Sequence, residues 1–144
     1  MREELPARAI GDGTYELLAS PSMASNVAKG DVIRVPPLDG SAEIVRRGGN
    51  VCVQVFTQHH LTIDEHQAIE VAFRKALTGS VDGESDKSMC FSIPVNAGFS
   101  AIEHFFNDLA TRYSGLVWSY GNVYADDTAT PLNGASTAGK VDLP

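Results

Sequence analysis

The chain of 144 residues is long enough for one domain or two small fused lobes, and it can bury about two-thirds of its unfolded surface without a metal or disulfide. Its 18 acidic and 11 basic residues give a net charge of −7, which argues against a nucleic-acid-binding surface and favours basic partners. The sequence has neither an apolar run of about 18 residues nor a signal-peptide core, so we expect a cytoplasmic protein without membrane contact.

The first half of the sequence has the pattern of short β-strands. Runs rich in Val, Ile, Leu and Tyr alternate with Ser-Pro, Pro-Pro and Gly-Gly-Asn segments that are typical of turns. The segment Arg47-Gly-Gly-Asn50 predicts a hairpin turn, because glycine and asparagine readily adopt positive φ. Both sides of the 51–57 run are apolar, which predicts a central strand shared between the halves. We expect a small curled sheet or partial barrel over residues 10–58, with strands at 15–20, 31–35, 42–47 and 51–57.

From residue 61 onward the apolar residues follow a helical period. Thr62 and Glu65 have the spacing of a capping box, and the apolar stripe that follows predicts a helix over 63–78. A second capping box, Ser100 with Glu103, predicts another helix that ends before Gly115. Strand patterns occur at 89–95 and 116–124, and the polar segment 80–88 is expected to be a loop.

Together these elements predict an α+β protein. The β-α-β-α-β order over residues 51–124 is typical of a ferredoxin-like two-layer sandwich, in which both helices cover one face of the sheet. Because this unit continues directly from the β-rich lobe, we expect a single compact domain over residues 1–125. Residues 126–144 lack apolar periodicity, which predicts a flexible tail.

Short motifs in the first half resemble a bacterial protein family. They are, in chain order, Gly11-Asp-Gly-x-Tyr15, Ser20-Pro21, Gly30-Asp-Val-Ile33 and Arg46-Arg-Gly-Gly-Asn-Val51. The sequence resembles, over about residues 5–125, the family known only as domain of unknown function 4265. This resemblance implies a family without an established chemistry, so function has to be inferred from the residues themselves.

Three groups of polar residues are candidates for a functional site. His59, His60 and Glu65 lie where a strand meets a helix, and such a group can bind a ligand or move protons. Adjacent histidines diverge in a strand and their spacing is not that of a zinc site, so we expect no metal and no cofactor. Two acidic groups are candidates for a partner-binding surface: Asp82, Glu84 and Asp86 in the expected central loop, and Asp126 and Asp127 after the last strand.

The remaining reactive and aromatic residues have ordinary structural explanations. Cys52 and Cys90 stand alone in strand-like runs, which predicts buried, reduced thiols. The sequence contains no nucleophile elbow, phosphate loop or dinucleotide fingerprint. Trp118, Tyr120 and Tyr124 alternate along one strand, which is typical of a core layer or, on an exposed face, of a protein-binding patch.

These observations favour a non-catalytic binding protein. We expect an immunity protein that neutralises a cognate toxin by direct occlusion, because surplus negative charge suits association with a basic toxin. One alternative is a small-ligand-binding or regulatory module with a pocket between the two halves. The third hypothesis is a hydrolase-like enzyme that uses His59, His60 and Glu65.

Overall fold

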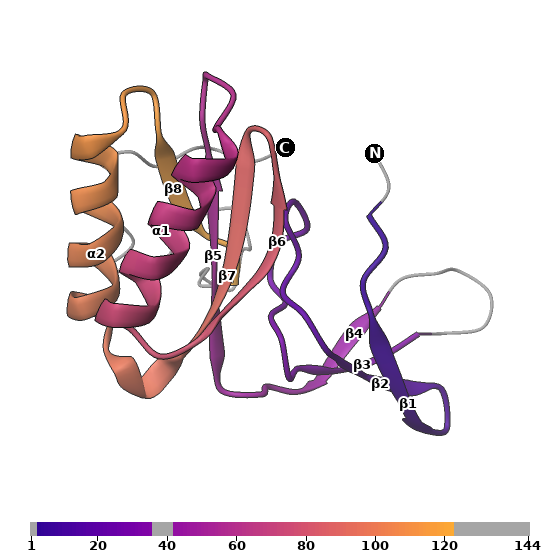
Figure 1. The fold of residues 1–144 in the computed structure, drawn as a ribbon. Coiled ribbons are helices and arrows are strands. Elements are labelled where there is room, and N and C mark those ends of the chain that lie inside the picture. Colours follow the sequence, from indigo (N-terminus) through magenta and orange to yellow (C-terminus); the bar gives the residue numbers. More distant parts are fainter. Residues whose placement is uncertain (1–2, 36–41, 123–144) are drawn as a thin grey trace.

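The computed structural model describes residues 3–35 and 42–122, which form two antiparallel sheets and two helices (Figure 1). The predicted α+β class is confirmed. No helix in this part of the chain is long and apolar enough to span a bilayer. The elements are β1 (Ala7–Gly11), β2 (Thr14–Leu17), β3 (Val32–Arg34), β4 (Glu43–Arg46), β5 (Asn50–Phe56), α1 (Ile63–Ala76), β6 (Ser80–Ser85), β7 (Ser88–Pro94), a 3-10 turn (Val95–Ala97), α2 (Phe99–Arg112) and β8 (Val117–Tyr120).

The first sheet is an open meander with the strand order β1-β2-β3-β4. Strand β1, which the sequence analysis did not predict, joins β2 through a tight turn at Asp12 and Gly13, whose φ angles of 54° and 73° suit a twisted hairpin. Strands β1 and β4 form the two edges, so the described strands make an open sheet rather than a closed barrel.

The second sheet has the strand order β6-β7-β5-β8, and all its described pairings are antiparallel. The strands predicted at 51–57, 89–95 and 116–124 correspond to β5, β7 and β8, which share this sheet as predicted, with β5 in a central position. Strand β8 is shorter than predicted, and residues 123–124 lie outside the described residues. The expected loop at 80–88 is wrong, because residues 80–85 pair with β7 as an edge strand. Val81 is the only large apolar residue in β6, so its partner strand, rather than its own hydrophobic pattern, defines it.

Both helices pack on one face of the second sheet, as predicted (Figure 1). Side chains alternate across a strand, so the odd-numbered residues of β5 and β7 face the helices. Trp118 and Tyr120 of β8 are buried in this same layer, whereas Tyr124 lies outside the described residues. The buried core consists of Val51, Val53, Val55, Ile69, Phe73, Met89, Phe91, Ile93, Ile102, Phe105, Phe106, Leu109, Leu116, Trp118 and Tyr120.

The two helices begin differently. The Thr62 hydroxyl accepts a hydrogen bond from the Glu65 amide, and the Glu65 carboxylate accepts one from the Thr62 amide, which confirms the predicted capping box. The second predicted box is wrong, because α2 begins at Phe99 with Gly98 as its N-cap. Glu103 instead accepts a hydrogen bond from the Tyr120 hydroxyl at 3.0 Å. Burial, together with this hydrogen bond and the carboxylate charge, raises the pKa of Tyr120.

The segment 18–31 covers the opposite face of the second sheet and joins it to the first (Figure 1). Gln54 of β5 donates hydrogen bonds to the carbonyl oxygens of Pro21 (3.0 Å) and Ala24 (2.8 Å). The predicted hairpin at 47–50 is wrong, because β4 pairs with β3 whereas β5 pairs with β7 and β8. The glycines of that segment instead let the chain cross from one sheet to the other.

Candidate functional site

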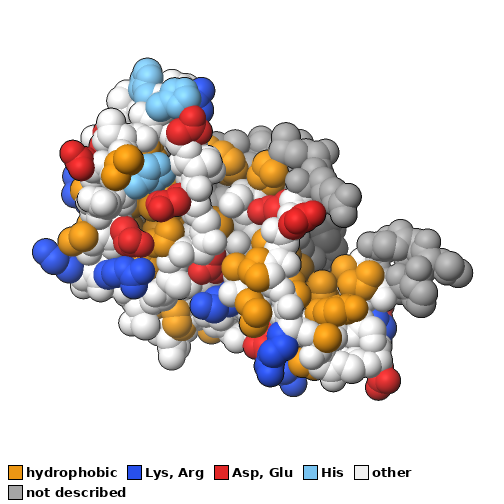
Figure 2. All heavy atoms as spheres, turned by 45° about the vertical axis from the view of Figure 1, so that its right-hand side comes forward, with side chains coloured by type: hydrophobic (Ala, Val, Ile, Leu, Met, Phe, Trp, Pro, Cys, Tyr) orange, Lys and Arg blue, Asp and Glu red, His pale blue; other side chains and the backbone are white. Residues whose placement is uncertain are grey.

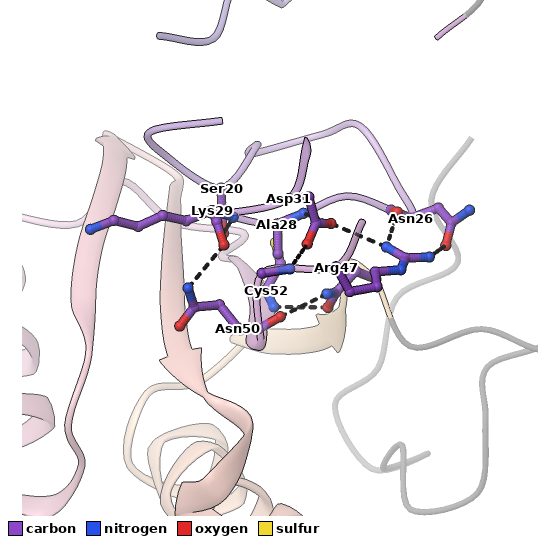
Figure 3. A network of polar contacts seen from close by, with 10 residues as sticks. Ser20, Asn26, Ala28, Lys29, Asp31, Arg47, Asn50 and Cys52 are labelled. Atoms are coloured by element: carbon purple, nitrogen blue, oxygen red, sulfur yellow. Dashed lines mark hydrogen bonds and ion pairs between the residues drawn. The ribbon is translucent and has the colours of Figure 1, made fainter. Parts of the chain in front are cut away.

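A buried carboxylate organises the crossover between the two sheets. Asp31 is 1 % exposed and lies at the entrance of β3. Its carboxylate accepts hydrogen bonds from the amides of Ala28 (3.0 Å) and Gly48 (2.8 Å) and forms an ion pair with Arg47 (3.1 Å). Figure 3 shows Arg47 reaching toward both Asp31 and Asn26. This network satisfies the buried charge and fixes the crossover to segment 26–31.

The backbone approach at this junction requires glycine. A Cβ on Gly48 would lie 2.2 Å from the carbonyl carbon of Gly30, so the position tolerates no side chain without a backbone shift. Asn50 also donates a hydrogen bond to the Lys29 carbonyl at 2.9 Å. Gly30, Asp31, Gly48 and Asn50 all belong to the motifs that carry the family resemblance, and the fold brings them together as a structural joint.

The three acidic residues predicted at 82–86 separate into two roles. Asp82 accepts hydrogen bonds from the Ser20 amide at 2.7 Å, the Ser80 hydroxyl at 2.5 Å and the Ser92 hydroxyl. Ser92 is 2 % exposed, so Asp82 belongs to the packing between segment 18–31 and the second sheet. The half-buried Asp82 is therefore already engaged in contacts within the fold.

Glu84 and Asp86 lie at the β6–β7 hairpin and face histidines near α1. The Asp86 carboxylate is 2.6 Å from Nδ1 of His60, and both side chains are largely exposed. The Glu84 carboxylate is 3.2 Å from Nδ1 of the mostly buried His66. Figure 2 shows histidine and acidic side chains gathered at one end of the molecule. The fold thus joins two groups that are separate in the sequence, which the sequence analysis did not foresee.

The proposed catalytic group does not assemble in the described part of the chain. No hydrogen bond or ion pair among the described residues joins His59, His60 and Glu65: His60 pairs with Asp86, and Glu65 caps α1. Within residues 3–35 and 42–122 no three His, Cys, Asp or Glu side chains are placed to hold a metal ion. The candidate residues Asp126 and Asp127 lie outside the described residues.

Among the described residues, the first sheet has an apolar face that is only partly covered: Tyr15 is 36 % exposed, and Ile33 and Ile44 are half-buried. Within β1–β4 only Leu17 and Val32 are buried, and every residue of β1 is exposed. The register places Tyr15, Ile33 and Ile44 side by side on one face. Figure 2 shows hydrophobic side chains gathered over this sheet. Further exposed apolar residues in or next to its strands are Ile10, Leu18, Val35 and Val45. We call Tyr15, Ile33 and Ile44 the open apolar row.

The sequence analysis predicted a small curled sheet or partial barrel over residues 10–58, but it did not predict the open apolar row. The signal that was available is the Asp-Gly pair at 12–13, which is typical of a two-residue hairpin and reveals β1. The alternation of residues 14–17 and 32–34 indicates strands, but no local pattern tells whether a second layer covers them.

Both thiols are expected to react slowly in the folded protein. Cys52 and Cys90 are free and at most 1 % exposed, and each sulfur faces a backbone carbonyl of residues 20–21. Burial raises the pKa of both thiols, that of Cys90 to about 11, so the reactive thiolate is scarce at neutral pH. Labelling with a disulfide reagent at pH 7.5 should be at least about a hundredfold slower in buffer than in denaturant. Complete labelling of either cysteine within the mixing time of the native sample would contradict this burial.

Comparisons with known proteins identify the family and the fold. The family model described as Domain of unknown function (DUF4265) matches residues 3–117. A solved structure, described as a novel crystal structure of a hypothetical protein from Neisseria gonorrhoeae, is similar with a TM-score of 0.61 and 16 % sequence identity. The match covers 79 % of this chain and 78 % of that chain. At this identity the likeness concerns the fold alone. No curated protein matches the sequence.

Proposed function

The chain belongs to the DUF4265 family, and on that premise we propose that it is a non-catalytic, cytoplasmic protein-binding module whose partner packs on the open apolar row. The observation that carries this proposal is a four-stranded sheet with only two buried side chains in its strands. A sheet normally buries one face against another layer, and a contiguous exposed apolar patch is typical of an interaction surface. The partner would supply the missing layer.

We propose that the partner is a toxin and that the protein is its immunity protein. This proposal is supported by the physical properties of the surface. The apolar and aromatic side chains of the open apolar row would provide binding free energy, and the net charge of −7 would speed association with a basic surface. Glu84 and Asp86, which are exposed at the β6–β7 hairpin, would contribute to this steering. The contacts of His60 and Glu65 described above favour binding over the hydrolase-like hypothesis.

We further propose a ferredoxin-like arrangement for residues 50–122. The support is the order β5-α1-β6-β7-α2-β8, with β5 and β7 in the middle of the sheet and both helices on one face. The other face of this sheet is covered by segment 18–31, through contacts such as those of Gln54. This leaves the first sheet as the more accessible β surface for a partner.

The test is co-expression with the product of the neighbouring gene. The wild-type protein is expected to rescue growth and to form a stable complex in a pull-down. The triple variant Tyr15→Thr, Ile33→Thr, Ile44→Thr should weaken the complex by roughly a hundredfold or more and lose rescue, because it removes the apolar anchors while keeping residues that favour strands.

Two controls make the result specific. Ile63→Thr changes a side chain of α1 that is 76 % exposed, and it should leave both binding and rescue unchanged. Glu84→Lys with Asp86→Lys should mainly slow association, because exposed charges act on encounter more than on residence time. If the triple variant loses its fold, the single variant Tyr15→Thr replaces it. The proposal would be overturned if the product of the neighbouring gene is not toxic. It would also be overturned if a folded variant of the open apolar row binds that product with wild-type affinity.

A further inference from the structure

A short segment without regular secondary structure lies over the face of the second sheet that points away from the helices. We call residues 21–25 the strap; it runs between Ser20, which is 2 % exposed, and Asn26. Within the strap only Pro21 is buried, and none of its residues belongs to the hydrophobic core. Hydrogen bonds to side chains, more than apolar burial, therefore hold the strap in place.

The strap amides converge on one carboxylate. Glu3 accepts hydrogen bonds from the backbone amides of three successive residues, Ser22 (2.6 Å), Met23 (3.1 Å) and Ala24 (3.1 Å). Successive amides arranged in this way form a concavity that suits an anion. Among the described residues Glu3 forms no ion pair, so these amides are the groups that hold its charge.

Both thiols of the protein lie under the strap. The Sγ atom of Cys52 is 3.5 Å from the Pro21 carbonyl oxygen, and the Ser22 hydroxyl is 3.4 Å from Sγ of Cys90. The two cysteines occupy even-numbered positions of β5 and β7, which point away from the helices. A reagent that approaches this face therefore reaches either sulfur only when the strap moves.

Two buried polar atoms on this face have no hydrogen-bond partner in the described part of the chain. They are Oε1 of Gln54, whose side-chain nitrogen bonds to the strap carbonyls, and Oγ of Ser119. The two residues are 0 % and 3 % exposed, and they pair across β5 and β8, so their side chains share one face. Buried acceptors without a partner are costly, and water satisfies them when a cover opens. This cost favours local opening of the strap.

We propose that the strap opens locally to give access to Cys52 and Cys90, and that Glu3 is the latch that keeps it closed. On opening, the strap amides lose the Glu3 carboxylate and Gln54 loses its two carbonyl acceptors, while both helices stay packed on the sheet. The thiols then react through this local opening and not through global unfolding. The latch requires neither a protein partner nor the open apolar row, so it goes beyond the function proposed above.

Exchange of the side-chain amide protons of Gln54, followed by NMR, tests the latch. These protons bond to the strap and not to Glu3, so they report opening of the strap itself. In Glu3→Ala both their exchange and thiol labelling should become roughly tenfold faster or more, because the closed form alone loses three hydrogen bonds to a carboxylate. Glu3→Gln keeps one acceptor oxygen, so its rates should lie between those of Glu3→Ala and the wild type.

The control is Glu4→Ala, which removes the same charge from the neighbouring, exposed position and should leave both rates unchanged. Burial and, to a smaller extent, the Glu3 charge raise the pKa of both thiols, so loss of Glu3 speeds labelling even without opening. Exchange at Gln54 is free of this effect and decides the result. Equal exchange rates in Glu3→Ala and Glu4→Ala would overturn the proposal.

Urea distinguishes local opening from global unfolding. Local opening exposes little surface, so wild-type labelling and Gln54 exchange should depend only weakly on urea below the unfolding transition. A dependence as steep as that of global unfolding would also overturn the proposal. If Glu3→Ala does not fold, the comparison is made between Glu3→Gln and Glu4→Gln.

Discussion

Replacing Phe106 by alanine is expected to lower the free energy of unfolding by about 3–5 kcal/mol, which is a large part of the stability of a domain of this size. The Phe106 ring of α2 is fully buried and packs against Phe91 of the sheet and Phe73 of α1. Its centroid lies 5.0 Å from those of Phe91 and Phe105 and 5.8 Å from that of Trp118. Truncation therefore removes apolar burial and opens a cavity at the centre of the aromatic cluster.

Chemical denaturation measures this effect, with Val71→Ala as the matched control. Val71 lies on α1 and is 52 % exposed, so its truncation should change the free energy of unfolding by less than about 0.5 kcal/mol. A loss below about 1 kcal/mol for Phe106→Ala would mean that the helices do not pack on the sheet as described.

Replacing the buried Asp31 by alanine is expected to lower the free energy of unfolding by roughly 3 kcal/mol. The change removes the acceptor for two backbone amides and leaves the guanidinium of Arg47 without its ionic partner. The Ala28 amide is then left without an acceptor in a buried position, and unsatisfied buried donors are costly. The effect should be structural, because Asp31 holds the crossover rather than a ligand.

Arg34→Ala is the control for this second prediction. Arg34 forms an ion pair with Glu43 on the same sheet, but both side chains are at least half exposed, so the loss should be at most about 1 kcal/mol. The loss of stability in Arg47→Ala should lie between those of Asp31→Ala and Arg34→Ala, because Asp31 would still accept hydrogen bonds from two backbone amides. Equal losses for Asp31→Ala and Arg34→Ala would contradict the role assigned to the buried carboxylate.

Local sequence patterns correctly predicted the helices and strands that have an apolar side packed in the core. The stripe that contains Ile69 and Phe73, together with the Thr62 cap, sufficed to predict α1, and the apolar run at 51–57 sufficed to predict a central strand. Strand β6 was not predicted because its small polar residues lack an alternating hydrophobic pattern. This edge strand is instead stabilised by its pairing with β7. The Ser100 and Glu103 box failed because Glu103 bonds to Tyr120, which is remote in sequence.

The candidate site was harder to predict than the fold. Charge patterning grouped Asp82 with Glu84 and Asp86, but only tertiary structure separates a half-buried carboxylate bonded to segment 18–31 from two exposed ones. The open apolar row is accessible because no second layer packs on it in the described structure. A local sequence motif does not show whether another layer covers a strand. Register across three strands is likewise a non-local property.

Hydrogen exchange in the complex with the neighbouring gene product tests the central claim most directly. Amides of β1–β4 should gain strong protection on binding, since their strands are largely uncovered in the free protein. The amides of α1 and α2, on the far side of the second sheet, should exchange as before (Figure 1). Protection confined to the helices or to the β6–β7 hairpin, or failure of the complex to form, would contradict binding through the open apolar row.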